Sequence, residues 1–244
     1  MNRKALVQKD YIKYLGVLMD EHLKWAPHIA AVNSKISRGI GILAKLKHFL
    51  NQKLLTNIYY SLVYSHLSYG IQAWGSACST ELKKIKTLQN KAVRIMTGNQ
   101  YYQIYGQPAV PLPSADPLYK SLKILKFDDI FRLNISNFIY LTLNGESPPN
   151  FNTWFVYNHN IHSYATRNDT HIINNDYFDP GTVVPSTSLR PFRSNLVNYG
   201  DKLIKVNGPK IWNDLPDAIR ECTSIFTFKL HLKTYFISNY NGHH

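Results

Sequence analysis

The spacing of apolar residues changes near Trp25 and separates a strand-like segment from a helical one. Residues 5–19 mix β-branched and aromatic residues with polar ones, which predicts a β-hairpin that turns at Lys9 and Asp10. A lone hairpin of this size is marginally stable and leaves an edge exposed, so it needs a larger sheet to join. We therefore expect residues 1–24 to be the end of a larger β-structure.

Beyond Trp25 the pattern predicts one long α-helix with an apolar face and a basic flank. The apolar positions are Trp25, Ile29, Val32, Ile36, Leu43, Leu46 and Leu50. The basic row on the flank consists of His28, Lys35, Arg38 and Lys45. Gly39 and Gly41 each weaken such a helix by about 1 kcal/mol relative to Ala, so they indicate a bend or the close approach of another backbone.

Two more helices are predicted within residues 25–100, which we expect to form a helical bundle. Residues 52–69 are apolar on most sides, which predicts a central buried helix. The next helix runs from a predicted N-cap at Ser79 to a stop at Gly98. Its apolar face comprises Leu82, Ile85, Leu88, Ala92 and Met96, and its basic face comprises Lys83, Lys84, Lys91 and Arg94. We expect the two basic helices to form a continuous positive wall.

The remaining chain reads as a linker followed by a small mixed region. Residues 101–117 contain Pro108, Pro111, Pro113 and Pro117 and are predicted to be a linker. In residues 118–244, one or two helices over 118–143 precede a polar, irregular or weakly β stretch over 150–207. Ser224 caps a final helix with Phe228, Leu232 and Phe236 facing inward. The fold class is thus mainly α.

The charge of the chain lies in its first half. The formal net charge is +13. Residues 1–126 hold 18 Lys and Arg against 5 Asp and Glu, whereas residues 127–244 hold 10 of each. This asymmetry favours contact with nucleic acid, although a surface adapted for solubility has the same composition.

Other sequence features concern the cellular setting. No apolar run is long enough to span a membrane, and no secretory signal is readable. Cys78 and Cys222 are too few and too far apart for a disulfide framework or a zinc site. We expect an intracellular protein, in the nucleus, the cytoplasm or both.

Three groups of residues resemble landmarks of one family. The first is Tyr14-Leu15-Gly16, followed by Asp20, Leu23, Trp25, His28 and Ile29. The second is Thr166-Arg167 after His162. The third is Gly208, Trp212-Asn213, Leu215-Pro216, Phe228-Lys229, Lys233 and Tyr235. Together they resemble the C-terminal, thumb and post-thumb, portion of non-LTR (LINE, jockey-like) retrotransposon reverse transcriptases, over essentially the whole chain.

The resemblance implies a role in holding nucleic acid. Enzymes of that family copy element RNA into DNA, with palm aspartates that hold two magnesium ions and a helical thumb that grips the template–primer duplex. By this resemblance Tyr14, Leu15 and Gly16 form a strand near the primer end, and the basic row faces the duplex. The resemblance also implies that residues 1–24 are the end of a palm-like β-hairpin. The partners implied are RNA or RNA–DNA duplex, bound with low sequence specificity, and the missing polymerase portion.

We find no residues in the sequence that match the catalytic aspartates of the family. Two-metal catalysis needs carboxylates that share a pair of ions about 4 Å apart. Asp128-Asp129 is the one Asp-Asp pair, but apolar spacing around it predicts a helix surface, where adjacent side chains diverge. We therefore expect a chain that begins after the palm carboxylates, lacks polymerase activity and holds no cofactor. Magnesium would belong to the missing palm.

Other constellations favour structural readings. His159, His162 and His171 lack a Cys or carboxylate at ligand spacing. Trp212, Leu215, Pro216 and Phe228, like Trp25, read as structural residues, with Trp212 clamping the last helix. The alternatives to a polymerase fragment are a host-retained module that binds nucleic acid or protein, and a transposon relic without a selected function.

Overall fold

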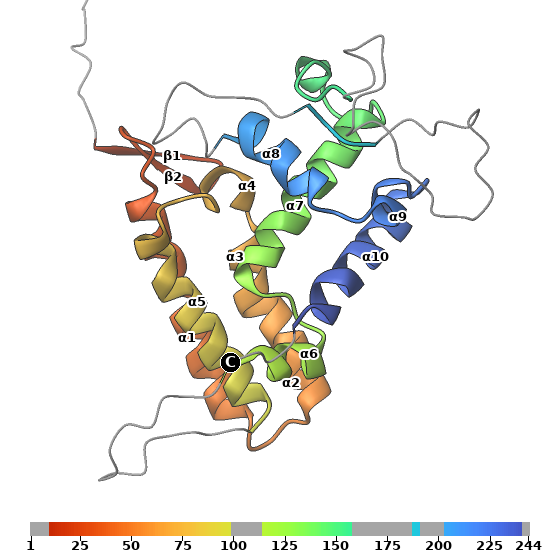
Figure 1. Cartoon of the computed structure of the whole chain (residues 1–244). Coiled ribbons are helices and arrows are strands. Elements are labelled where there is room, and N and C mark those ends of the chain that lie inside the picture. The colour runs from red at the N-terminus through yellow and green to blue at the C-terminus, as the bar shows by residue number, and fades with distance from the viewer. Residues whose placement is uncertain (1–9, 99–113, 158–186, 191–202, 241–244) are drawn as a thin grey trace, which may run out of the picture. The chain divides into compact units, whose positions relative to one another are not determined.

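The chain is mainly helical, with one short β-hairpin at its start, as predicted (Figure 1). The computed structural model describes residues 10–98, 114–157, 187–190 and 203–240. The predictions for Lys9, Pro108, Pro111, Pro113, His159, His162, Thr166-Arg167 and His171 lie outside these ranges. The chain divides into two compact units: unit 1 is Met1–Phe131 with Ile237–His244, and unit 2 is Arg132–Phe236. The domain boundaries expected from the sequence stay predictions.

The hairpin of unit 1 turns later than predicted. Strands β1 (Tyr11–Tyr14) and β2 (Val17–Asp20) pair antiparallel, with Tyr14 opposite Val17. Leu15 and Gly16 form the two-residue turn, with φ angles of 45° and 83°. Such tight hairpin turns need positive φ at both central residues, which Gly adopts without strain. The turn of the described hairpin is therefore at Leu15 and Gly16 and not at Asp10, and in the Tyr14-Leu15-Gly16 landmark only Tyr14 is part of a strand.

Asp20 shapes the connection from the hairpin into the first helix. Its carboxylate accepts hydrogen bonds from the backbone N–H groups of His22, Lys24 and Trp25, at 3.2, 2.9 and 2.6 Å. Burial by itself raises the pKa of Asp20, but these three donors lower that pKa overall. Leu23 and Trp25 both have positive φ, at 52° and 67°. Asp20 therefore stabilises a turn that ordinary residues rarely adopt.

Helix α1 (Ala26–Leu46) confirms the predicted apolar face. Ile29, Val32, Ile36 and Leu43 are buried, whereas Trp25, Leu46 and Leu50 at its ends are half-buried. A Cβ atom added to Gly39 would lie 2.9 Å from the backbone oxygen of Leu62. Gly39 thus permits the predicted close approach of another backbone. Gly41 has open space around it.

The next helical stretch changes its hydrogen-bonding pattern midway. It comprises α2 (Gln52–Tyr59), a π-helical segment η1 (Tyr60–Tyr64) and α3 (Ser65–Ser68). Tyr59, Val63 and Leu67 are fully buried, but the opposite side is exposed to solvent. The predicted central buried helix is therefore wrong, because only one face of this stretch packs in the core of unit 1.

Helix α5 (Ser79–Met96) follows the short helix α4 (Ile71–Trp74) and packs directly against α1. Leu82, Ile85, Ala92 and Met96 are buried as predicted. Cys78, not Ser79, occupies the N-cap position, and its side chain makes no capping hydrogen bond. Gly98 has a φ of 69° just past the helix end, which confirms the predicted stop.

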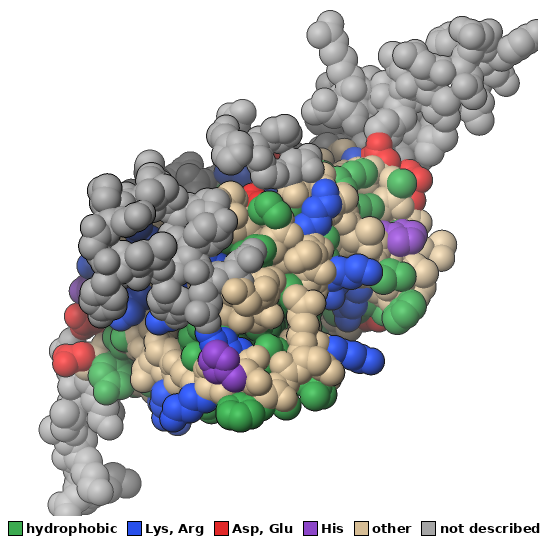
Figure 2. Space-filling view, turned by 90° about the horizontal axis from the view of Figure 1, so that it is seen from below, with side chains coloured by type: hydrophobic (Ala, Val, Ile, Leu, Met, Phe, Trp, Pro, Cys, Tyr) green, Lys and Arg blue, Asp and Glu red, His purple; other side chains and the backbone are tan. Residues whose placement is uncertain are grey.

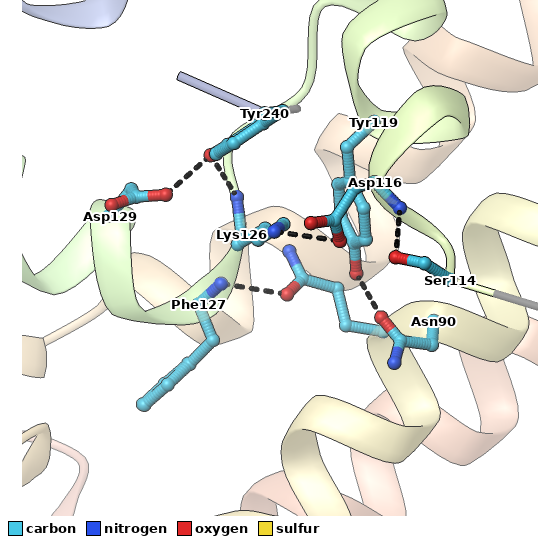
Figure 3. Close-up of polar contacts among 9 residues, drawn as sticks. Asn90, Ser114, Asp116, Tyr119, Lys126, Phe127, Asp129 and Tyr240 are labelled. Carbon is cyan, nitrogen blue, oxygen red and sulfur yellow. Dashed lines mark hydrogen bonds and ion pairs between the residues drawn. The ribbon is translucent and has the colours of Figure 1, made fainter. Parts of the chain in front are cut away.

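A network of polar contacts joins the remaining parts of unit 1 (Figure 3). Buried Gln89 donates to the Tyr59 hydroxyl and to the Leu125 carbonyl, and accepts from the Phe127 N–H, all within 2.9 Å. Tyr240 accepts from the Lys126 N–H at 2.9 Å and donates to Asp129 Oδ2 at 2.6 Å. These bonds tie the C-terminal end of unit 1 to the start of helix α7 (Phe127–Leu143).

The linker predicted over residues 101–117 ends in a helix. Helix α6 (Asp116–Leu122) begins with Asp116 and Pro117 in its first turn. Pro is compatible with that position, since the first-turn N–H groups of a helix have no intrahelical partner. The Asp116 carboxylate pairs with the Lys126 ammonium at 2.7 Å (Figure 3).

Unit 2 is built around aromatic side chains. It contains most of α7, the 3-10 turn η2 (Pro149–Phe151), α8 (Ile204–Asn213), α9 (Asp217–Arg220) and most of α10 (Ile225–Ser238). The Phe228 ring stacks on Tyr140 and on Trp212, with centroids 4.6 and 5.8 Å apart. Trp212, Leu215 and Phe228 are buried, and their purely structural role stays a prediction. Pro216 is exposed and immediately precedes α9.

Asn213 supplies a contact that the sequence did not indicate. Its side-chain amide accepts from the Leu189 N–H at 2.8 Å and donates to the Leu189 carbonyl at 2.9 Å. The neighbouring Trp212 indole donates to the Thr187 carbonyl at 3.0 Å. The Trp-Asn landmark therefore holds an extended segment in unit 2. Among the helices that the structure describes, none is both long and apolar enough to cross a membrane.

Candidate nucleic-acid interface

Three of the four residues in the predicted basic row of α1 are accessible. Lys35, Arg38 and Lys45 are exposed. None of them forms an ion pair with another residue in the described ranges. Their charges are therefore available to a ligand, while the buried side of the same helix holds them on a fixed backbone.

His28 does not belong to this exposed row. It is only 5% exposed, and its ring lies edge-on to Trp74 with centroids 5.3 Å apart. Its Nδ1 accepts a hydrogen bond from the Leu18 N–H at 3.3 Å. Burial, and then the charge of Lys35, lower the pKa of His28. The expectation that His28 faces a ligand is wrong, because β2 and Trp74 cover it.

His66 takes the place of His28 beside the row. The contact between Gly39 and Leu62 brings α1 and the η1–α3 stretch together, and the two run in opposite directions (Figure 1). Lys35 lies one helical turn before Gly39, and His66 lies one turn after Leu62. Partial burial, and then the charges of Lys35 and Arg38, lower the pKa of His66. The three side chains therefore interact electrostatically across two helices.

Helix α5 carries the second predicted basic set. Lys83, Lys84 and Lys91 are exposed, and Arg94 is half-buried. The neighbouring Lys86 is neutralised by Asp128, with Nζ and Oδ1 2.8 Å apart. Since α1 and α5 are direct neighbours, both sets belong to one pair of helices. That they act as one continuous wall stays a prediction.

The strongest charge signal in the sequence is an absence of acidic residues. Between Glu21 and Glu81 there is no Asp or Glu, but there are six Lys and Arg and four His. This stretch contains α1, α2, η1, α3 and α4. Its lack of acidic residues is the sequence signal that could have identified His66 as a candidate contact residue. Figure 2 shows Lys and Arg side chains spread over the visible surface, with apolar side chains between them and acidic ones mainly toward the edges.

The end of the hairpin is the other predicted contact region. Tyr14 and Leu15 are 64% and 73% exposed. The Tyr69 hydroxyl donates to the Leu15 carbonyl, and its ring lies beside Gly16. These contacts support the turn from the helical part of unit 1. The role of Tyr14, Leu15 and Gly16 near a primer end stays a prediction.

The only Asp-Asp pair of the sequence lies in the first turn of α7, as predicted. Asp128 pairs with Lys86 of α5, whereas Asp129 accepts from Tyr240. The two carboxylates therefore point to different partners and do not fit a shared pair of magnesium ions. Within the described ranges, no three His, Cys, Asp or Glu side chains are grouped to hold a metal ion.

Comparison with known proteins identifies relatives from mobile elements. The chain is 31% identical over 100 residues to "Probable RNA-directed DNA polymerase from transposon X-element" of Drosophila melanogaster, which is 39% of the chain and 11% of the relative. It is 34% identical over 103 residues to the probable RNA-directed DNA polymerase from transposon BS of the same fly, 40% of the chain and 11% of the relative. It is 31% identical over 106 residues to the RNA-directed DNA polymerase from mobile element jockey of that fly, 42% of the chain and 12% of the relative.

These matches support the predicted relationship to retrotransposon RNA-directed DNA polymerases over about 40% of the chain. They span only 11 to 12% of the length of each relative. No protein-family model and no solved structure matches the chain.

Proposed function

We propose that this chain is a piece of a retrotransposon RNA-directed DNA polymerase that grips the template–primer, an RNA or RNA–DNA duplex, and does not itself join nucleotides. The observation that carries the proposal is the exposed row of Lys35, Arg38 and Lys45 on a helix whose other side is buried. The relatives named above act on nucleic acid by their names, which adds support for such a ligand.

The proposed mechanism is contact with backbone phosphates. Lys and Arg neutralise phosphates and release counterions, so affinity is insensitive to sequence and falls as salt rises. Lys35 and Lys45 are ten residues apart on α1, and a helix rises 1.5 Å per residue, so they are about 15 Å apart along the axis. That span lets the row contact several successive phosphates of one strand. His66 adds a hydrogen-bond donor beside Lys35 and Arg38.

The first test reverses the charge of this row. The triple variant Lys35→Glu, Arg38→Glu, Lys45→Glu should bind an RNA–DNA duplex about tenfold or more weakly at low salt. The slope of log affinity against log salt should become shallower by about 2 to 3, since roughly 0.9 is lost per phosphate contact. Fluorescence anisotropy titrations over a salt series measure both quantities.

The matched control applies the same charge change elsewhere. Arg190, Lys210 and Lys229 are exposed residues of unit 2, and replacing all three by Glu changes the net charge equally. This control should retain most of the affinity and the salt slope of the unchanged chain. Equal losses in the two triple variants would mean that net charge, and not the α1 row, determines binding.

The second test concerns catalysis. The Asp128-Asp129 pair does not fit two-metal chemistry, so we expect no primer extension by this chain with magnesium and deoxynucleotides. Extension of a labelled primer on an RNA template would be followed on a denaturing gel. Incorporation that is lost in an Asp128→Asn, Asp129→Asn double variant would contradict the proposal.

A further inference from the structure

The turn between α1 and α2 displays a phenylalanine at its tip. Phe49 is 81% exposed, more than any other large apolar side chain in the described part of the chain. The turn around it is well anchored. The N–H groups of Phe49 and Leu50 both donate to the Leu46 carbonyl at 3.0 Å. The Asn51 side chain caps α2 by accepting from the Leu54 N–H at 3.0 Å. The ring is therefore carried on an ordered support.

A single exposed apolar residue is common on protein surfaces and does not indicate a site. The surroundings of Phe49 are what set it apart. Lys45, Lys47, His48 and Lys53 lie within four residues of it, and the nearest acidic residues along the chain are Glu21 and Glu81. Lys45, His48 and Lys53 are exposed. An aromatic face in a positive field suits a ligand that is planar, apolar on its faces and attached to anions.

We propose that Phe49 is a stacking platform for an unpaired base of single-stranded nucleic acid, with Lys45 and Lys53 contacting the phosphates on either side of that base. The inference rests on the proposed function, because it extends the basic row of α1 to the end of the helix. The inference adds unpaired bases as a second kind of ligand, which the basic row does not need in order to bind a duplex. Phosphate contacts hold a duplex, whereas the ring holds a base that has left the stack.

The choice of an unpaired base follows from geometry and energy. Inside a duplex both faces of a base are covered by its neighbours, so a side chain at a protein surface stacks only on an unpaired or terminal base. Stacking of a base on an aromatic side chain is sequence-tolerant and contributes about 1 to 3 kcal/mol per base. Since every 1.4 kcal/mol is a tenfold change, this corresponds to a factor of roughly 5 to 150 in affinity.

The test compares two substrates that differ only in unpaired bases. One is a blunt RNA–DNA duplex, and the other is the same duplex with a single-stranded extension. Phe49→Ala should weaken binding to the extended substrate about tenfold while changing binding to the blunt duplex less than twofold. The salt slope should stay constant, since no charge is lost. Phe49→Trp should retain or increase the affinity.

Two controls separate stacking from other effects. An extension of abasic nucleotides keeps the phosphates and removes the bases, so Phe49→Ala should have no effect on it. Phe226 is 73% exposed in unit 2, where charges are balanced, and Phe226→Ala should change neither substrate. Melting temperatures of the variants verify the fold.

The outcomes distinguish this inference from the proposed function. Equal losses on blunt, extended and abasic substrates would overturn base stacking. No loss in Phe49→Ala, with a large loss in the Lys35, Arg38 and Lys45 triple variant, would also overturn it while leaving the grip intact. If neither variant changes affinity, both proposals fail. Binding of a protein partner that depends on Phe49 alone, without any effect on nucleic acid, would overturn it too.

Discussion

The two units of this chain differ in the charges that surround their exposed aromatic residues. In unit 2, Trp212, Phe228 and Tyr140 stack inside the core, and the charges of the second half of the chain balance. In unit 1, Trp74 is buried, but Phe49 stays exposed among unbalanced basic residues. Folding explains the stacked aromatic residues of unit 2, and exposed Phe226 lies where charges balance. Folding does not explain a surface on unit 1 that keeps positive charge and an aromatic ring in water, which is why we assign the ligand to unit 1.

The largest expected effect tests whether Trp212 is purely structural. Trp212→Ala removes a stacked, fully buried ring and its hydrogen bond to Thr187, so it should destabilise unit 2 by about 3 kcal/mol or more. Urea denaturation followed by circular dichroism measures the change, and exposed Phe226→Ala is the control. A loss below about 1 kcal/mol would show that the stack with Phe228 does not support unit 2.

A pair of glycines in α1 tests the packing that positions the basic row. Gly39→Ala places a Cβ 2.9 Å from the Leu62 carbonyl, so it should destabilise unit 1 by about 1 to 3 kcal/mol. Gly41→Ala, on the same helix but in open space, should stabilise it by about 0.5 to 1 kcal/mol. The two melting temperatures should move in opposite directions. A shift in the same direction would mean that α1 and η1 are not in close contact.

His28 makes the stability of unit 1 depend on pH. Its pKa is lowered by burial, so the unfolded chain binds the proton more readily than the folded one. The contribution of neutral His28 to the free energy of unfolding is therefore fully present above about pH 6.5, the ordinary pKa of His, and is lost as the pH falls below that value. His28→Gln cannot titrate at this position, so between pH 8 and 5 its free energy of unfolding should fall less than that of the unchanged chain. Denaturation at a series of pH values measures this difference, and identical pH profiles would contradict it.

The smallest expected effect concerns His66 and ligand binding. Its lowered pKa leaves it neutral at pH 7.5 in the free chain, and a phosphate beside it favours the protonated form. Binding then takes up a proton, so affinity for an RNA–DNA duplex should rise about two- to threefold between pH 7.5 and pH 6. His66→Gln should abolish that rise without weakening binding at pH 7.5 more than twofold. A rise of the same size in the variant would place the titrating group elsewhere.

Several features of the molecule were already readable from local patterns. The 3.6-residue period identified the buried faces of α1, α5 and α10, because helical geometry alone decides which residues share a face. The same period placed Asp128 and Asp129 on a helix. The family landmarks indicated relatives among mobile-element polymerases, which the comparisons support over about 40% of the chain. The nucleic-acid ligand indicated by the charge asymmetry stays a prediction. Each of these inferences needs only residues that are close in sequence or a sum over many residues.

Other features were decided by contacts between distant residues. His28 and Lys35 lie on the same flank of α1, but β2 and Trp74 cover only His28. His66 joins Lys35 and Arg38 because Gly39 lets α1 approach Leu62, and Asn213 holds Leu189 from 24 residues away. The sequence by itself determined which residues are apolar or charged and on which helical face they lie. Only the tertiary structure decided which residues at the edge of a face are covered, because that depends on neighbours supplied by another part of the chain.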